Sequence, residues 1–356
     1  MSKSTDRTLV ILTPGFPANE DDSTCVPPQQ IFVKALKEVA PELNIIVLAF
    51  QYPFSSERYS WHDVDVISFG DPKNRRILRA FVGMRVRREL RTITRQHNVL
   101  GLLSFWAGKC AWVGHIFAAK HNLKHLSWLL GQDAKADNKY LPKFNLQPDS
   151  LIAISDFVAD TCERNHGVRP ANVIPVGVNS QLFKTSSKRD IDILGAGSLV
   201  PLKQYDVFIE VIMLLTKDMP WVKAAICGDG PEMKKLKTLI EEKQLENNIQ
   251  LIGRCDHGQV LRYMEQSKVF MHPSNYEGFS TVCLEALYAG NQVVSFIKPM
   301  HFDIENWTIV DNAQQMAVSI KAILQNNDLK NQSVLPYDVH DNAKKMLELF
   351  DYSISN

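Results

Sequence analysis

Short runs of apolar residues alternate along the chain with longer segments in which apolar residues recur at helical spacing. In the first half these runs are bounded by polar residues, glycine or proline, as buried strands of a parallel sheet usually are. The first run leads through a loop that contains Gly15 into a helical segment at residues 29–39. The strands expected in this half cover residues 9–12, 45–49, 64–68, 100–105, 125–129 and 151–154.

The same alternation begins again after a polar run, KTSSKRD at residues 184–190, which has the composition of a linker. Strands are expected at residues 191–195, 222–227, 249–252, 269–272 and 293–296, and helices at residues 203–215 and 233–244. Repeated alternation of strands and helices is typical of parallel sheets covered by crossover helices. We therefore predict an α/β protein with two doubly wound, Rossmann-like domains.

The composition is compatible with this architecture. Of 356 residues, 45% are hydrophobic and 22% are charged, which is ordinary for globular proteins, and the length exceeds that of one usual core. The formal net charge of +1 gives no general attraction to nucleic acid, so no nucleic-acid partner is expected. There is no apolar leader and no apolar run approaching about 18 residues, so we expect a cytoplasmic protein.

The chain offers no obvious metal ligands. Its six cysteines are scattered, without a C-x-x-C pair, and are expected to be reduced and mostly buried. Two D-x-D strings, at residues 63–65 and 190–192, lie in or beside expected strands and not in open loops. We therefore expect neither a metal ion nor a cofactor.

The most informative stretch is HPSNYEGFSTVCLEALYAGNQVVSF, residues 272–296. We expect a strand to end at His272, a loop to follow, Ser280 to begin a helix and Gly290 to end it. The helix N-terminus then faces the edge of the sheet at which ligands bind in such folds. Free backbone N–H groups and the positive end of the helix dipole favour a diphosphate there, and Gly278 permits its close approach.

Two glutamates flank the start of this helix. Glu277 lies in the loop and Glu285 lies a little over one turn into the helix, so both carboxylates can reach one ligand. Carboxylates pair with vicinal hydroxyls, such as those of a sugar ring and a ribose, and a diphosphate joins these two groups in a sugar nucleotide. Glutamates at this spacing are also common on solvated surfaces, so the pair alone does not decide.

Several segments, taken in order, resemble retaining glycosyltransferases of family 4, which have the GT-B fold of two Rossmann-like domains. Residues 277–285 resemble the E-x7-E element of that family. The other similar segments are GAGSLVPLKQYDVFIEVI at 195–212, CGDGPEMKKL at 227–236, IQLIGR at 249–254, and an interdomain segment at 154–183 in which Asn179 replaces a frequent aspartate. Agreement of several linked elements carries more weight than one motif.

The resemblance implies how the donor site is divided along the loop and helix. Glu277 would hold hydroxyls of the donor sugar, and the backbone of Gly278 and Phe279 would lie close to that sugar. Ser280 and Thr281 would offer N–H groups to the diphosphate. The second glutamate of the element, Glu285, would hold the ribose.

Three further donor-side residues come from the preceding segments. Lys203 matches the lysine that stabilises the departing diphosphate, and Arg254 would lie beside the nucleobase. Ser198 stands where the family usually has an arginine, so a bidentate phosphate partner is lost. Lys203 would therefore contribute more of the phosphate stabilisation.

The first half departs further from the family. Gly101 and Ser104 stand where the family often has the two polar residues of an Asp-x-x-His strand end. Leu130 stands where the family has the histidine that positions the donor sugar. Gln132 and Asp133 are the polar residues that remain on this loop, as substitutes or as solvated loop residues.

The resemblance implies a retaining glycosyltransferase of the hexosyl type that needs no metal ion. It would move a sugar from a nucleotide-diphosphate sugar to a hydroxyl of a glycan or lipid-linked acceptor, through an oxocarbenium-like transition state. The candidate catalytic residues are Glu277, Lys203 and Asp133, and Gly15 and Gln132 are the acceptor-side candidates.

Three other classes of protein compete with this interpretation. One is a non-catalytic partner subunit that binds a sugar nucleotide, in which Ser104, Leu130 and Ser198 mark lost chemistry. Another is a sugar-nucleotide epimerase of the same fold. A dinucleotide oxidoreductase is disfavoured because GAGSLV, residues 195–200, lacks the third glycine of the G-x-G-x-x-G pattern.

Two helical segments have further implications. Arginines crowd residues 72–98, where Glu89 is the one acid, and a partly apolar face at residues 73–95 fits peripheral contact with the anionic inner face of a membrane. A crossover helix with a solvated basic face is the alternative. In the family a C-terminal helix often packs back on the first domain, as residues 338–356 would here. The expected domains are 1–183 and 184–337, followed by this helix.

Overall fold

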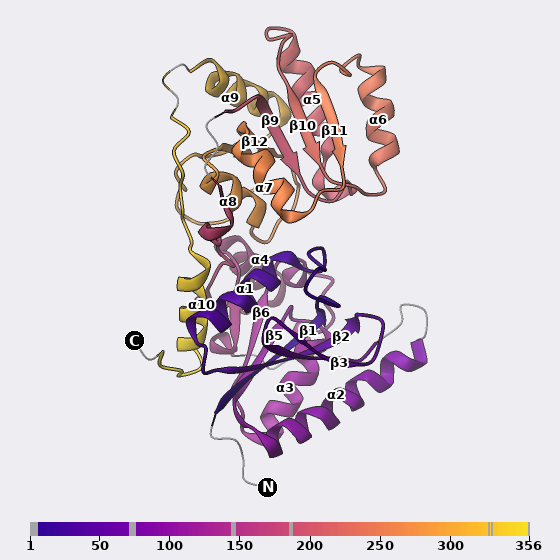
Figure 1. Cartoon of the computed structure of the whole chain (residues 1–356), viewed down its shortest axis with the longest axis vertical. Helices are drawn as coiled ribbons and strands as arrows, with labels where there is room; N and C mark the ends of the chain where they lie inside the picture. Colours follow the sequence, from indigo (N-terminus) through magenta and orange to yellow (C-terminus); the bar gives the residue numbers. More distant parts are fainter. Residues whose placement is uncertain are drawn as a thin grey trace. The chain divides into compact units, whose positions relative to one another are not determined.

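The structure is a computed structural model that describes residues 6–70, 76–143, 147–184, 188–326, 328 and 330–354. Contacts divide the chain into two compact units, each with its own sheet and core (Figure 1). The first unit contains the residues up to Val176 together with the segment from Val339 onward, and the second unit is Gly177–Asp338.

The chain passes into the second unit before the polar run at residues 184–190. The Val178 N–H donates to the Tyr337 carbonyl at 2.9 Å, and Val178 forms a parallel bridge with Asp338. By contacts the first limit therefore lies between Val176 and Gly177, whereas the sequence analysis set it at residue 183.

The first unit is built on an eight-stranded sheet in the order β3-β4-β2-β1-β5-β6-β7-β8. Its strands pair in parallel except for β3, which is antiparallel to β4 at one edge. The central strand is buried completely from Leu9 to Leu12 because helices cover both faces of the sheet. The strands are β1 (Arg7–Gly15), β2 (Asn44–Tyr52), β3 (Arg58–Trp61), β4 (Val64–Ser68), β5 (Asn98–Phe105), β6 (His125–Leu129), β7 (Leu151–Ala153) and β8 (Asn172–Val173).

In Figure 1, α2 and α3 lie on one face of this sheet and α1, α4 and α10 lie on the other. The helices are α1 (Pro27–Val39), α2 (Arg76–Gln96), α3 (Lys109–His121), α4 (Asp156–His166) and α10 (Val339–Glu348), with 3-10 helices η1 (Gln132–Ala134), η2 (Leu141–Lys143) and η3 (Pro148–Ser150). The start of α4 is fixed by Ser155, whose hydroxyl accepts from the Val158 N–H, and Gly167 ends it at a φ of 71°.

The second unit has a six-stranded parallel sheet in the order β11-β10-β9-β12-β13-β14. The strands are β9 (Ile191–Ala196), β10 (Ala224–Cys227), β11 (Ile249–Gly253), β12 (Ser267–His272), β13 (Gln292–Ser295) and β14 (Trp307–Ile309). The helices are α5 (Tyr205–Thr216), α6 (Met233–Glu242), α7 (His257–Glu265), α8 (Thr281–Tyr288) and α9 (Ala313–Gln325), with 3-10 helices η4 (Ser180–Leu182) and η5 (Pro201–Lys203).

The strands expected from apolar runs are all present, so the prediction of two parallel α/β sheets is confirmed. Strands that the sequence analysis did not anticipate lie at sheet edges. The strand β3 has mostly exposed or half-buried residues, and β8 and β14 are only two and three residues long. Such strands lack the apolar run that marks a strand buried on both faces.

The C-terminal helix completes the core of the first unit. It packs against α1, and its apolar stripe, which includes Ala343, Met346 and Leu347, is fully buried. The Phe350 side chain, which follows the helix, lies over β5 at Gly101. A Cβ atom at Gly101 would come within 2.6 Å of that ring and 2.9 Å of the Lys124 carbonyl.

This contact predicts that Gly101→Ala destabilises the protein. Inserting one methyl group into a filled space should cost about 1–3 kcal/mol, because the Phe350 ring or the backbone must move. The matched control is Gly83→Ala in α2, where the added Cβ meets only Val113 at an ordinary 3.5 Å, so the variant should keep or slightly raise stability. Denaturant unfolding of both variants measures the difference, and equal stabilities would contradict the packing described here.

Candidate functional site

The candidate site lies at the carboxyl edge of the second sheet, where loops following β9 and β12 meet. The strand β12 ends at His272, and its loop leads into α8. Two hydrogen bonds tie this loop to the segment after β9: the Asn275 N–H and the Ser274 hydroxyl both donate to the Leu202 carbonyl, at 3.2 and 3.1 Å. They bring Lys203, the last residue of η5, beside Glu277.

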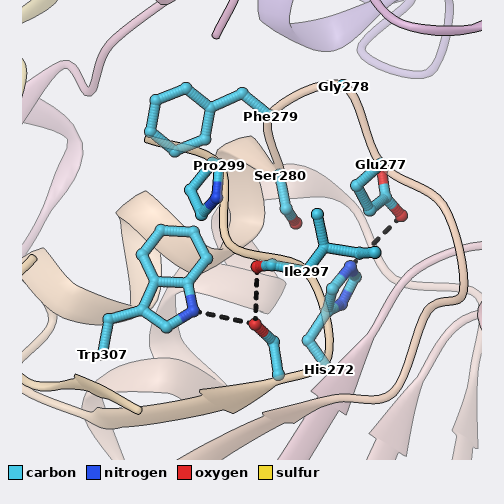
Figure 2. A pocket seen from close by; sticks show the side chains of 9 residues that line it. His272, Glu277, Gly278, Phe279, Ser280, Ile297, Pro299 and Trp307 are labelled. Carbon is cyan, nitrogen blue, oxygen red and sulfur yellow. Dashed lines mark hydrogen bonds and ion pairs between the residues drawn. The ribbon is translucent and has the colours of Figure 1, made fainter. Parts of the chain in front are cut away.

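The Glu277 carboxylate is the centre of this site. Its Oε1 accepts a hydrogen bond from Lys203 Nζ, a second from Ser274 Oγ at 2.9 Å and a third from His272 Nε2 at 3.2 Å (Figure 2). Burial by itself raises the pKa of Glu277, but the bond from His272 and the charge of Lys203 outweigh burial and lower the pKa to about 2. Glu277 is therefore an anion at neutral pH.

His272 is buried and neutral. Burial, together with the charge of Lys203, lowers its pKa below the usual value despite the bond to Glu277. Because an ionised carboxylate only accepts hydrogen bonds, the His272 proton must lie on Nε2. His272 thus adds a hydrogen bond to Glu277 without adding a charge.

The N-terminus of α8 opens beside this cluster. Ser280 is its N-cap residue, but no side-chain hydrogen bond caps the helix. The Ser280 hydroxyl is buried and finds no hydrogen-bond partner among the residues that the structure describes. In Figure 2 it points into the space between the side chains that line the pocket. Uncapped N–H groups and the positive helix end provide a site suited to an anion.

A pocket at this helix start has one polar wall and one apolar wall. Trp307 stacks at a tilt near Phe279, with ring centroids 6.0 Å apart, and its Nε1–H donates to Ser295 Oγ at 2.9 Å. Tyr337 packs edge-on against Phe279 at 5.7 Å. The lining residues are His272, Glu277, Gly278, Phe279, Ser280, Ser295, Ile297, Pro299 and Trp307 (Figure 2). Carboxylate and imidazole groups opposite aromatic rings suit a polar ring ligand such as a sugar.

Glu285 has a different partner. Its side chain is 6% exposed, and its Oε1 lies 2.7 Å from Nε2 of His257, the first residue of α7. Burial alone lowers the pKa of His257, but the hydrogen bond to Glu285 and the charge of Glu285 outweigh burial and raise that pKa. Each glutamate of the E-x7-E element is thus held by a histidine.

The loop after β9 is shaped by the glycine-rich turn after β10. The Gly197 N–H donates to the Cys227 carbonyl and the Leu199 N–H to the Asp229 carbonyl, both at 3.0 Å. Gly228 has a φ of 153°, and a Cβ atom there would fall 1.9 Å from the Gly197 carbonyl oxygen. Only glycine permits this approach. Ser198 and Arg254 are exposed, the former on this loop and the latter after β11.

The candidate residues of the first unit lie on loops at its own sheet edge. Asp133 is buried, and its carboxylate accepts from the N–H groups of Ala107, Leu130 and Gly131 at 2.8, 3.0 and 2.9 Å. Both of its oxygens are therefore used in ordering the loop after β6. Gln132 is exposed on the same loop.

Gly15 ends β1 and is buried. A Cβ atom there would lie 3.3 Å from Tyr52 Cβ and 3.6 Å from the Cys25 sulfur. The loop that follows is ordered by Asp22, whose carboxylate accepts from the Tyr52 hydroxyl at 2.8 Å and from the Cys25 N–H at 3.2 Å.

The structure also accounts for the D-x-D strings and the cysteines. Asp192, in β9, accepts from the Lys223 N–H at 2.9 Å and from Lys268 Nζ at 2.8 Å, so it serves the sheet edge. Among the described residues, no group of three His, Cys, Asp or Glu side chains is placed to hold a metal ion. The six cysteines are free thiols, of which four are buried.

The basic helix α2 turns one face to the core of the first unit. Val82, Val86, Leu90 and Ile93 are buried there. Phe81 and Met84 are instead 48% and 50% exposed, and the arginines near the C-terminal end of the helix are exposed as well. Of the segment 73–95, residues 73–75 lie outside the described residues. Within the part of the chain that the structure describes, no helix has the length and apolarity required to cross a bilayer.

Sequence reasoning missed His257 and His272, the partners of the two glutamates. His272 directly precedes the loop that carries Glu277, so its place at the strand end was a usable signal. His257 is separated from Glu285 by 28 residues, and no local pattern connects them. Only the packing of α7 against α8 makes this pair.

The paired α/β units and the site at the sheet edge define the class of fold. Sucrose-phosphate synthase from Thermosynechococcus elongatus superposes with a TM-score of 0.77 at 18% identity, over 97% of this chain and 98% of that one. HepE from Anabaena, solved with UDP and glucose, superposes with a TM-score of 0.69 at 17% identity, over 97% and 99%. The protein has the GT-B fold of glycosyltransferases, as the sequence analysis predicted.

Residues 179–334 match the model of the family Glycosyl transferases group 1, so the second unit carries a group 1 glycosyltransferase domain. The gpi3 subunit of phosphatidylinositol N-acetylglucosaminyltransferase from Schizosaccharomyces pombe is 30% identical over 148 residues, 39% of this chain and 32% of that protein. The corresponding protein of Arabidopsis thaliana is 29% identical over 44% of this chain and 37% of its own length. The matches thus span only about a third of these relatives.

The ionisation of Glu277 predicts a pH-dependent stability difference. Its pKa is lowered in the folded protein, so its stabilising effect is present above the unfolded value of about 4.5 and is lost as the pH falls toward 2. The free-energy difference between the wild type and Glu277→Gln should therefore shrink, by about 2 kcal/mol, between pH 6 and pH 3. Urea unfolding at each pH measures it, with Glu242→Gln on exposed α6 as the control. A difference independent of pH would contradict the described network.

Proposed function

We propose that this protein is a retaining glycosyltransferase of family 4 type that uses a nucleotide-diphosphate sugar as donor and a glycan or lipid-linked hydroxyl as acceptor, without a metal ion. The observation that carries this proposal is the Lys203–Glu277–His272 cluster beside the uncapped start of α8. It places a cation, a carboxylate and a positive helix end around one pocket.

The donor sugar fits the pocket with its hydroxyls on Glu277. One carboxylate oxygen, Oε1, already accepts three hydrogen bonds, so Oε2 is the oxygen that would bind a sugar hydroxyl. The backbone of Gly278 and Phe279 would lie along the sugar, opposite Trp307. Carboxylate recognition of hydroxyls is strong because the acceptor is charged.

The diphosphate would bind where α8 begins. Ser280 and Thr281 would offer backbone N–H groups, and the unpartnered Ser280 hydroxyl is aimed into the same space. Lys203 would shift from Glu277 toward the phosphates, so that its charge stabilises the negative charge that develops on the leaving group. Arg254 and Ser198, both exposed, would complete the donor site at the base and at the phosphates.

The bond from the anomeric carbon to the diphosphate would break through an oxocarbenium-like transition state, and the acceptor oxygen would form the new bond with retention. On the acceptor side we assign Gln132 and Gly15 to substrate contacts. Asp133 would support catalysis by ordering the loop after β6, since both of its oxygens accept backbone N–H groups. This role needs no proton transfer by Asp133.

Relatives and neighbours support a sugar nucleotide as donor. The curated relatives include N-acetylglucosaminyltransferases, among them the poly(ribitol-phosphate) enzyme of Staphylococcus aureus, which is 31% identical over 43% of this chain and 34% of that enzyme. HepE was solved with UDP-glucose. UDP-linked sugars are therefore the first donors to test.

A lipid-linked acceptor would bring the protein to the cytoplasmic face of a membrane. Phe81 and Met84 are exposed on α2, which also carries exposed arginines such as Arg91 and Arg95. Apolar side chains among cations suit the interface of an anionic bilayer. We propose peripheral contact through this helix.

A second candidate function is a sugar-nucleotide-binding partner subunit without catalysis. It is favoured by Leu130, which replaces the family's sugar-positioning histidine, and by relatives that are named as subunits of a larger transferase. Both functions predict donor binding. Release of free sugar from the donor distinguishes them, because only a catalyst performs it.

Donor binding is tested with UDP-glucose, UDP-N-acetylglucosamine, GDP-mannose and ADP-glucose, by thermal shift and calorimetry. At least one should bind, and Lys203→Ala and Glu277→Ala should each weaken that binding by about tenfold or more, because each removes a charged partner. Glu242→Ala, on exposed α6, is the control and should bind as the wild type does. Unchanged affinity in both site variants would reject the assignment.

Turnover is followed in the same samples as release of free sugar, with and without a chelator. A transferase should release sugar slowly at an unchanged rate in the chelator, since Lys203 and the start of α8 supply the positive charge. Loss of turnover on chelation would refute metal independence. Binding without any release would favour the non-catalytic alternative.

Membrane contact is tested by sedimentation with vesicles of phosphatidylcholine alone or mixed with phosphatidylserine. The protein should bind only the anionic vesicles, and binding should weaken as salt increases. The double variant Phe81→Asp/Met84→Asp should bind about tenfold less, because two apolar contacts are lost and two negative charges are added. The matched control is Val318→Asp, at a 69% exposed position of α9. No binding to anionic vesicles at low salt would rule out the contact.

A further inference from the structure

The contact between His257 and Glu285 lies outside the pocket around Glu277. The Glu285 side chain is 6% exposed and the His257 side chain 23%, and their nearest atoms, Oε1 and Nε2, are 2.7 Å apart. A hydrogen bond this short between a buried carboxylate and an imidazole restricts both side chains. One end of the Glu285 carboxylate is thus fixed by the protein.

The position of His257 is set by the start of α7. Asp256 caps this helix in a capping box: its carboxylate accepts from the Gln259 N–H at 2.7 Å, and the Gln259 side chain accepts from the Asp256 N–H at 2.8 Å. His257 is the next residue, and α7 packs against α8, so the imidazole faces Glu285. The local sequence therefore delivers the histidine to one defined place.

Few charged groups surround the pair. Asp256 is the nearest other carboxylate that acts on His257, and Glu285 is the one charged residue of α8. On the strands that pack against α7, Lys268 is paired with Asp192 and His272 with Glu277. The position of the Glu285 carboxylate therefore depends on His257.

The other oxygen of Glu285 is available to a ligand. No hydrogen bond from the described residues reaches Oε2, and this atom is not among the buried side-chain atoms that lack a partner. It therefore keeps contact with solvent although the residue is buried. A carboxylate with one oxygen fixed and the other open presents a single acceptor in a defined direction.

We propose that His257 is a positioning residue that holds Oε1 of Glu285 and directs Oε2 to the ribose hydroxyls of the nucleotide, so that it determines selectivity for ribonucleotides. This inference rests on the proposed donor site. A glutamate side chain loses considerable rotamer freedom when it binds a ligand, and a partner that restricts it beforehand removes that cost. A nucleotide without ribose hydroxyls gains nothing from this arrangement.

The test compares UDP with 2′,3′-dideoxy-UDP, and ADP and GDP with their dideoxy analogues, by calorimetry. In the wild type the dideoxy form should bind about tenfold more weakly or worse. His257→Ala should weaken UDP binding by about tenfold and leave dideoxy-UDP binding unchanged. His257→Gln, which keeps an N–H donor, should restore most of the affinity for UDP. Lys203→Ala serves as the contrast and should weaken both nucleotides by the same factor.

The two possible failures are distinct. If His257→Ala weakens UDP and dideoxy-UDP equally while its melting temperature stays close to that of the wild type, His257 acts only on the fold and the inference is overturned. The same holds if the wild type does not discriminate between the two forms. If the wild type binds none of the three nucleotides, the proposed donor site itself fails, and the inference fails with it.

Discussion

The carboxylate of Glu277 is the group on which the candidate site depends. It joins three parts of the second unit, since its partners come from the end of β12, the following loop and the segment after β9, with Lys203 74 residues away in the sequence. Burying an ion pair in this way costs desolvation energy, which a well-packed apolar cluster would avoid. A buried charge of this kind at a sheet edge is more characteristic of a binding site than of a structural core. The uncapped start of α8 beside it supports the same conclusion.

Much of the fold was accessible from the sequence because its strands are buried on both faces. Apolar runs such as residues 9–12 can hardly be anything else between loop signals, and the helix after Ser280 begins where its N-cap predicts. Edge strands such as β3 were missed because exposed strands have no such run. The pattern also located the Glu277 loop, but the histidine partners depend on packing between elements far apart in the chain. The role of Asp133 needed the structure as well, since a loop aspartate looks the same whether it orders backbone or binds substrate.

The departures from the family in the first unit are understandable as packing. Gly101 leaves room for the Phe350 ring, where any side chain would collide. Ser104 is buried and bonded to His125 at 2.9 Å, so a histidine at this position would have no space. These residues belong to the interior of the first unit, and their identity is explained without reference to a substrate.

The route of the chain between the units affects how the protein is made. The first unit is discontinuous, because its core is closed by α10 and Phe350, which are synthesised after the whole second unit. The ends of the second unit meet at Val178 and Asp338, as in a domain inserted into another. During translation the second unit can therefore be complete while the sheet of the first still exposes the apolar surface that α10 will cover, so this surface awaits the last residues to leave the ribosome.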